Sequence, residues 1–553
     1  MNSTKTIFGI DLGTTYSCIA YVDEYGQAVI IPNNEGSLTT PSVVHFDKDN
    51  RIVGKEAKNS AVLYPDEIVT AVKRHMGGPG WRFEYKKNAY SAEEISSYIL
   101  RKLADDARRY LGRPVQDVVI TCPAYFGIAQ RDATIRAGQI AGFNVRDIIN
   151  EPTAAAITYG LQSEQDQVVL VYDLGGGTFD ITVIQINNGE ITVISTGGDN
   201  NLGGRNWDES VLIYLAEQWK AETGMNDDPT ESEETMQDLW DKAEQVKWAL
   251  TARQEARVAI THLGHRVGIT LTRPKFEELT ANLLERTIVF TRDTLKDARA
   301  RGFADINQIL LVGGSTKMPQ VAGRLRQELA LPIRAFEPDT AVAKGAAIYA
   351  QKLVLDEEVQ NRVGEITATS MDKVNIDDVP QRLIHDVQQA IASDNGLLLD
   401  TVKRYNDLKV INVTSHSFGV IVKDQETSQD FISNIIMVND QLPTTQTKTY
   451  HTLQANQEAI EIKVMENSLF AHRLDDFAQA EEIGHAILHL PPRLPLHSPI
   501  EVRFELQKDG RLHMTAREPR HDISIEIEIQ TRHGLSDKEM HKAQDRSRKL
   551  FIS

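Results

Sequence analysis

Residues 7–18 read Ile-Phe-Gly-Ile-Asp-Leu-Gly-Thr-Thr-Tyr-Ser-Cys, an apolar strand followed by an aspartate and a small, hydroxyl-rich turn. Gly13 lets the main chain approach a polyphosphate closely because it has no Cβ atom, and Thr14 and Thr15 add hydroxyl donors. Asp11 stands at the strand end, where a carboxylate can hold a hydrated Mg²⁺ that bridges phosphate oxygens. The stretch therefore predicts a phosphate loop with a metal-binding carboxylate, and an ordinary β-hairpin turn is the alternative.

A second copy of this pattern occurs later in the chain. Residues 169–180 read Val-Leu-Val-Tyr-Asp-Leu-Gly-Gly-Gly-Thr-Phe-Asp, with Asp173 in the place of Asp11. Both copies are followed by apolar, β-branched strands, at 19–22 and 181–186. Two copies of one hairpin predict an internally duplicated α/β fold in which each half supplies one phosphate loop. The ligand is then expected in the cleft between the halves.

The composition predicts a multidomain protein without a nucleic-acid or membrane partner. At 553 residues the chain is too long for one hydrophobic core. Its 60 basic and 78 acidic residues give a formal net charge of −18, which disfavours nucleic acid and anionic membranes as partners. Only Cys18 and Cys122 are present, too few for a disulfide framework. Because we find neither a signal-like start nor a run of about 18 apolar residues, we expect a cytoplasmic protein.

The hydrophobic period changes along the chain. Helical and strand-like stretches alternate over the first part, as in α/β domains. At 310–319 a strand enters a Gly-Gly-Ser turn, which either binds an anion or a base edge or is a plain connecting loop. Beyond Val410 apolar residues alternate with polar ones, as at 460–464 and 523–529, which predicts antiparallel strands. Ser536, with a glutamate three residues later, has the capping-box pattern of a last helix.

Several stretches, in the same order, resemble the seventy-kilodalton heat-shock chaperone family. The wider actin and sugar-kinase superfamily shares the two phosphate loops but not this full set. The matching stretches are residues 9–17, 72–74, 123–126, 150–156, 173–180, 202–204, 311–316 and 339–343. The resemblance covers residues 5–350 almost continuously and implies an actin-like, duplicated α/β ATPase domain that binds ATP or ADP with Mg²⁺.

The resemblance also implies roles for single residues around the phosphates. Asp11 and Asp173 would organise Mg²⁺ and its waters, and Lys73 would place its charge against the γ-phosphate, where the transition state is most negative. Glu151 and Asp180 would orient the attacking water or a monovalent cation such as K⁺. The phosphate contacts would come from the two loops, through Gly13, Thr14, Thr15, Tyr16, Gly175, Gly176, Gly177 and Thr178. Without the resemblance, Lys73 would be interpreted as a solvated helix lysine.

The adenosine end departs from the family pattern. The two arginines that normally sandwich the adenine are replaced by Trp248 and Lys317. Trp248 can still stack on a base, whereas a lysine lacks the planar fork of arginine. We therefore expect ATP to bind with altered affinity or base selectivity. The other contacts to ribose and base match the family and are Glu244, Lys247, Thr251, Gly313, Gly314, Ser315 and Asp339.

The C-terminal part resembles the family's substrate-binding sandwich at 412–419 and 442–462. The resemblance implies an extended peptide held by main-chain hydrogen bonds and one apolar pocket. Leu453 would arch over the peptide. The pocket would be lined by Val420, Tyr450, Ile460 and Ile462, although alternating isoleucines are also what a plain sandwich core requires.

Three features concern communication between the parts. Pro123 and Arg131 match a family relay that passes the nucleotide state to the sandwich, and a strand-ending proline with a surface arginine is the alternative. The apolar run at 397–400 resembles the family's interdomain linker but is followed by seven further residues before Leu408, so coupling is expected to be weakened or rerouted. The lid is reduced to the helix after Ser536, which implies fast peptide release.

These observations predict an ATP-dependent chaperone that binds exposed apolar segments and hydrolyses ATP slowly. J-domain and nucleotide-exchange partners follow from the resemblance alone. The alternatives are a regulatory, ATP-sensing peptide-binding protein with weak turnover and a small-molecule kinase. The expected units are an actin-like ATPase domain (1–355), an extended, partly helical connector (356–409), an antiparallel β-sandwich (410–534) and a truncated lid helix (535–553).

Overall fold

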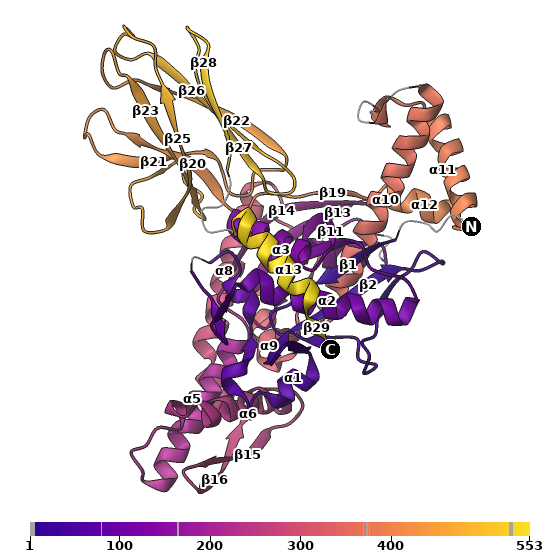
Figure 1. Cartoon of the computed structure of the whole chain (residues 1–553), viewed down its shortest axis with the longest axis vertical. Coiled ribbons are helices and arrows are strands. Elements are labelled where there is room, and N and C mark those ends of the chain that lie inside the picture. The colour runs from indigo at the N-terminus through magenta and orange to yellow at the C-terminus, as the bar shows by residue number, and fades with distance from the viewer. Residues whose placement is uncertain are drawn as a thin grey trace.

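A computed structural model describes residues 6–78, 80–162, 165–187, 189–368, 370–371, 374, 376–529 and 535–553. Figure 1 shows an α/β body, a β-sandwich at the upper left and a projecting group of helices at the upper right. Within the described ranges, none of the helices is both long enough and apolar enough to cross a bilayer.

Two six-stranded sheets form the body, and five strands of each follow a common spatial order, with β4 (Thr40–Pro41) and β19 (Lys409–Ile411) as the sixth strands. The first contains, in spatial order, β11 (Asn144–Asn150), β10 (Asp117–Cys122), β1 (Ile7–Asp11), β2 (Tyr16–Val22) and β3 (Ala28–Ile31). The second contains β18 (Ile333–Ala335), β17 (Gln308–Val312), β12 (Gln167–Leu174), β13 (Phe179–Asn187) and β14 (Glu190–Asp199). In each sheet the first three strands are parallel and the later pairs are antiparallel. This shared order confirms the predicted duplication.

Two helices lie between the sheets and position the site. They are α4 (Glu151–Gly160) and α10 (Ala341–Thr367), and they share a hydrophobic core with β1 and β12. At Gly345 a Cβ atom would lie 1.8 Å from the carbonyl oxygen of Ala154, so only glycine permits this close approach. The packing fixes the start of α4, where Glu151 lies.

The remaining elements of the body cover the sheets or form two peripheral lobes. The helices are α1 (Lys55–Ser60), α2 (Ala92–Leu111), α3 (Ile128–Ile140), α5 (Gly204–Thr223), α6 (Glu233–Ala252), α7 (Arg273–Leu279), α8 (Ala281–Ala300) and α9 (Pro319–Leu329). The short strands are β4 (Thr40–Pro41), β5 (Val43–Asp47), β6 (Asn50–Val53), β7 (Ile68–Thr70), β8 (Phe83–Tyr85), β9 (Asn88–Tyr90), β15 (Glu255–His262) and β16 (His265–Thr272).

The region expected to be an extended, partly helical connector (356–409) contains helices, and these pack against the body. Helix α10 runs through the expected boundary at 355, and α11 (Gln381–Asn395) and α12 (Leu399–Asn406) pack into the same core as the body. The hydroxyl of Tyr405 donates a hydrogen bond to the carbonyl oxygen of Gly26 at 3.0 Å. The apolar run at 397–400, expected to be the linker, lies at the start of α12. The sandwich is instead entered from β19 (Lys409–Ile411), which pairs in parallel with the edge strand β14.

The sandwich consists of two antiparallel sheets, as its period predicts. One sheet contains β20 (Ser417–Lys423), β21 (Asp430–Ile436), β23 (Ala459–Asn467), β24 (Arg473–Leu474) and β25 (Ala480–His489). The other contains β22 (Thr444–His451), β26 (Pro499–Leu506), β27 (Leu512–Glu518) and β28 (Ile523–Glu528). Side chains from both sheets, including Phe418, Val464, Phe504 and Met514, form one buried core between them.

The C-terminal segment returns to the α/β body instead of standing free as a short lid. Helix α13 (Asp537–Lys549) begins at the predicted Ser536 cap and lies against α2 and α3 (Figure 1). Arg546 of α13 forms an ion pair of 2.5 Å with Glu94. Strand β29 (Phe551–Ile552) then pairs in parallel with β6, and Ile552 is buried in the body's core. We call residues 535–553 the C-terminal clip.

We predict that Ile552→Ala detaches the end of the C-terminal clip, because deleting most of a buried aliphatic side chain costs about 2–5 kcal/mol. The amide of Val53 donates to the carbonyl oxygen of Ser553 at 2.9 Å. Hydrogen exchange at residues 50–53 should therefore accelerate at least tenfold in the variant. Phe551→Ala, at a neighbouring side chain that is 65% exposed, is the matched control. Equal protection in the two variants would contradict the assignment of Ile552 as the anchor.

Candidate active site

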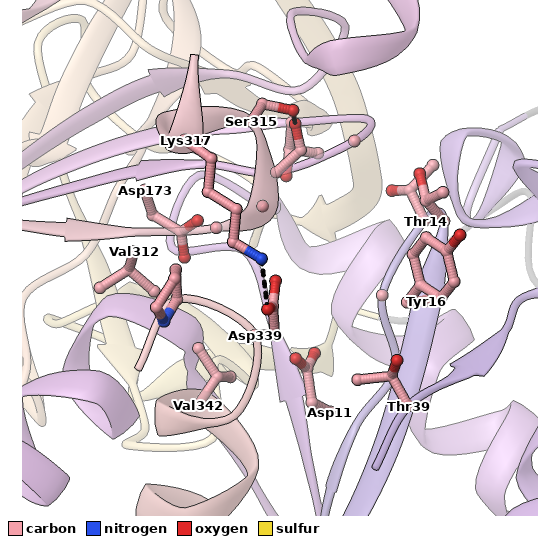
Figure 2. A pocket seen from close by; sticks show the side chains of 18 of the residues that line it. Asp11, Thr14, Tyr16, Thr39, Asp173, Val312, Ser315, Lys317, Asp339 and Val342 are labelled. Atoms are coloured by element: carbon pink, nitrogen blue, oxygen red, sulfur yellow. Dashed lines mark hydrogen bonds and ion pairs between the residues drawn. The ribbon is translucent and has the colours of Figure 1, made fainter. Parts of the chain in front are cut away.

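A cavity of about 520 Å³ lies where the two sheets of the body meet, and both predicted phosphate loops line it. Figure 2 shows Asp11, Thr14 and Tyr16 facing Asp173, Ser315, Lys317 and Asp339 across this space. Every nucleotide, metal and catalytic residue predicted from the sequence lines the cavity except Gly177 and Asp180. The lining residues that the sequence did not single out are Cys18, Thr39, Val312, Met318, Pro338 and Val342. Four of them, namely Cys18, Val312, Met318 and Val342, lie within stretches that the sequence analysis quoted.

The two phosphate loops touch one another, and glycine makes this contact possible. A Cβ atom at Gly176 would lie 1.9 Å from Oγ1 of Thr15, and one at Gly177 would lie 2.3 Å from Oγ1 of Thr14. Gly177 therefore supports the facing loop rather than the cavity wall. Ser315 adds a third contact, because its hydroxyl donates to the carbonyl oxygen of Gly175 at 2.9 Å. The backbone around the phosphate end is thus held from three segments.

A buried ion pair occupies the centre of the cavity floor. Nζ of Lys73 lies 2.5 Å from Oε1 of Glu151, and both side chains are buried. Lys73 belongs to a short 3₁₀ helix (Val72–His75), and Glu151 is the first residue of α4. Asp11 ends β1 and accepts a hydrogen bond from Thr121 at 3.2 Å. Lys73 is therefore no solvated helix lysine, and the structure brings it together with the predicted acidic residues.

Asp180 lies beside this group but outside the cavity lining. Its carboxylate accepts a hydrogen bond from the backbone amide of Tyr125 at 3.1 Å, which ties β13 to the segment after β10. Burial and the nearby Glu151 raise the pKa of Asp180 to about 7. The same two causes raise the pKa of Asp11 to about 7 and that of Asp173 well above its usual value.

The cavity floor therefore carries more buried acid than buried base. Burial opposes the charge of Lys73, but Glu151 and Asp11 raise its pKa overall. A divalent cation would relieve the remaining repulsion between carboxylates. No three acidic, His or Cys side chains in the described part of the chain stand close enough to hold a metal directly. These residues fit Mg²⁺, which keeps several waters and takes few protein ligands besides phosphate oxygens.

At the end of the cavity where the sequence predicts adenosine, an aromatic contact joins the two halves. The rings of Tyr16 and Trp248 are stacked, with centroids 6.2 Å apart and planes at 30°. Lys58, which the sequence did not single out, forms an ion pair with Glu244 and lies 5.6 Å from the Trp248 ring centroid. Lys317 pairs with Asp339 at 2.5 Å. Altered base selectivity stays a prediction, because Trp248 faces Tyr16 here.

A second cavity, of about 690 Å³, opens between the two sheets of the sandwich. We call it the sandwich groove. All five predicted peptide-binding residues line it, namely Val420, Tyr450, Leu453, Ile460 and Ile462. Val420 and Ile462 also belong to the sandwich core, whereas Leu453 is 48% exposed at the rim. All five residues therefore line the groove, and Val420 and Ile462 are also part of the sandwich core.

Arg131 lies at the interface between the body and the sandwich. Its guanidinium donates to the side chain of Asn150 at 2.7 Å, next to Glu151, and to the carbonyl oxygen of Phe126 at 3.0 Å. A Cβ atom at Gly510 of the sandwich would lie 3.2 Å from Cδ of Arg131. Pro123 is buried directly after β10. Arg131 thus links the start of α4 to the sandwich.

A buried glutamate of the sandwich meets the same interface. Oε1 of Glu466 accepts a hydrogen bond from the amide of Ile128 at 3.3 Å. Burial raises the pKa of Glu466 to about 7; the hydrogen bond from Ile128 and the charge of Arg131 lower it, and Glu481 raises it. His416 lies 3.8 Å away, and burial lowers its pKa to about 4, which keeps it neutral near pH 7.

Known proteins resemble this chain over its whole length. The family model described as Hsp70 protein matches residues 7–80, 78–365 and 359–551. Proteins named "Chaperone protein DnaK" from two strains of Halobacterium salinarum are each 36% identical over 555 residues, which covers 98% of this chain and 78% of theirs. The chain belongs to the Hsp70 family.

We predict that docking of the sandwich weakens as pH rises. The pKa of Glu466 is about 7 in the folded chain and 4.5 as an isolated group. Its contribution is therefore fully present below about pH 4.5 and is lost as pH rises through 7. Hydrogen exchange of the interface amides at 414–418, corrected for their intrinsic pH dependence, should report this loss between pH 5.5 and 8.

Glu466→Gln keeps an acceptor for Ile128 and should remove most of that pH dependence. Glu461→Gln, on the exposed face of the same strand, should leave it intact. An unchanged pH profile in Glu466→Gln would contradict the role of Glu466.

Proposed function

We propose that this chain is an ATP-dependent molecular chaperone that binds apolar segments of client proteins and hydrolyses Mg-ATP. One observation carries the proposal: a single chain joins the cavity with two phosphate loops to the sandwich groove through the interface at Arg131. Membership of the Hsp70 family supports the same function and does not favour a small-molecule kinase or a purely ATP-sensing protein.

The residues of the cavity floor divide the chemistry among them. Asp11 and Asp173 would hold Mg²⁺, which, when bound, neutralises charge on the phosphate oxygens. Lys73 supplies positive charge at the γ-phosphate end, and its ion pair with Glu151 fixes the position of its ammonium group. Glu151 would orient the attacking water or K⁺, with Asp180 acting from beside the cavity lining, and Thr178 would contact the γ-phosphate from the second loop.

Coupling to the groove would use contacts that already join the parts. Arg131 contacts Asn150, the residue before the catalytic Glu151, and reaches the sandwich at Gly510. Pro123 precedes the segment whose carbonyls bind Arg131. We infer that the nucleotide state moves α4 and is passed through Pro123 and Arg131. J-domain and nucleotide-exchange proteins are the expected partners, and the cytoplasm is the expected location.

Peptide affinity measured with ADP and with ATP tests this proposal. A fluorescent apolar peptide should bind the full chain at least about tenfold more weakly with ATP than with ADP. Coupling between the two sites requires that the bound nucleotide change the affinity for the peptide. Lys73→Ala should lower ATP hydrolysis at least about 100-fold while ATP still binds. Lys296→Ala, at an exposed lysine of α8, is the control for both measurements. Equal peptide affinity in the two nucleotide states would rule out the coupled mechanism.

A further inference from the structure

The sandwich groove is lined by more cationic than anionic side chains. Lys423, Lys448, Lys463 and Arg473 line it, against Asp430 and Glu461. The chain as a whole carries a formal net charge of −18. Charge on a ligand will therefore affect its binding wherever one of these cations has no acidic partner in the chain.

Two of these cations are neutralised by acidic residues of the chain. Arg473 forms ion pairs with Asp424 at 2.6 Å and with Asp475 at 2.8 Å. Lys423 lies 3.8 Å from Asp430. Neither cation is free to select a ligand by its charge alone.

Lys463 and Glu461 offset each other. They lie two residues apart on β23, and neither forms an ion pair with another described residue. Their charges cancel locally, which leaves Lys448 as the uncompensated charge of the groove.

Lys448 is half-buried and has a hydroxyl as its partner. Its ammonium donates to Oγ of Ser433 at 2.8 Å, and it forms no ion pair within the part of the chain that the structure describes. Burial lowers the pKa of Lys448. An ammonium group has three N–H donors, so further donors remain for a ligand. A partly desolvated cation without a counterion is unfavourable, and a ligand carboxylate would relieve that cost.

The same contact places this charge beside the apolar pocket. Lys448 and Tyr450 are two residues apart on β22, so their side chains leave the same face of the strand. Both donate to Ser433 on β21 of the facing sheet, Tyr450 at 3.0 Å. Ile500 and Val502, which also line the groove, pair with Tyr450 and Lys448 across the sheet. A peptide with an apolar side chain in the pocket would therefore carry its next side chains close to Lys448.

We propose that the sandwich groove selects extended apolar segments that carry an acidic side chain beside the buried apolar residue, and that Lys448 is the selecting residue. This inference rests on the proposed function of the groove as the client site. It names the substrate class: apolar segments with acidic flanks are preferred over the same segments with basic flanks.

Three labelled peptides with one leucine-rich core, flanked by Glu, Gln or Lys, test the proposal. Fluorescence anisotropy with the full chain and ADP should give the affinity order Glu, then Gln, then Lys, with at least about a tenfold difference between the extremes at low salt. Raising the salt to about 0.5 M should shrink that difference.

Lys448→Gln keeps a donor for Ser433 and should bring the Glu-to-Lys affinity ratio close to one. Lys448→Glu should invert the ratio. Arg511→Met, which removes a cation of the sandwich outside the groove, should preserve the order. An unchanged ratio in Lys448→Gln, or a preference for Lys flanks in the parent chain, would overturn the inference while the groove remains a client site. Absence of binding for all three peptides would contradict the proposed function and this inference with it.

Discussion

The buried ion pair between Lys73 and Glu151 lies where the two halves of the duplicated fold meet, and three further carboxylates surround it. Burial makes every unbalanced charge in this group unfavourable, so these carboxyls are either protonated or balanced by a cation. The two phosphate loops are pressed together around the pair, and glycine at 176 and 177 is the residue that allows it. The other walls of the cavity, which include the Tyr16–Trp248 contact and Ser315, surround these buried charged groups.

Helix α4 connects the cavity floor to the remainder of the chain. Glu151 begins α4, and Asn150 before it is a partner of Arg131, which touches the sandwich. Strand β19 ties the entrance of the sandwich to the edge of the second sheet, and the C-terminal clip ties its exit to the first half. The sandwich is therefore held at both of its ends by the nucleotide-binding body. In this arrangement α13 lies on the body, so the sandwich groove has no helical cover from it.

Much of the site could be predicted because its residues belong to local motifs. Asp11 is the last residue of β1 and Asp173 the last but one of β12, and glycines follow each aspartate within a few positions. Both loops can therefore be recognised in the sequence. The missed features depend on pairing between distant residues. Strand β29 has only two residues, too few to show an alternation of apolar and polar side chains. Lys58 could not be recognised as a site residue because its ion-pair partner, Glu244, lies far away in the sequence on the other half of the body.

The connector shows a different limit. The apolar run at 397–400 resembles a linker. Together with Val402 and Tyr405, however, it forms an apolar face that packs on α10, and the chain is helical from Leu399. The strand that does join the body to the sandwich, β19 at 409–411, has only three residues, and its composition gives no signal that would mark it as a linker. Tertiary packing decided between the two candidates, and the sequence pattern alone could not.

The most direct test of this account is the dependence of ATP affinity on Mg²⁺, measured by titration calorimetry with the full chain. A floor with surplus buried carboxylate should bind ATP at least about tenfold more tightly with Mg²⁺ than with a chelator present. Asp11→Asn and Asp173→Asn should each reduce that difference. Equal affinity with and without Mg²⁺ in the parent chain would contradict the claim that the carboxylates around Lys73 and Glu151 require a metal-bound nucleotide.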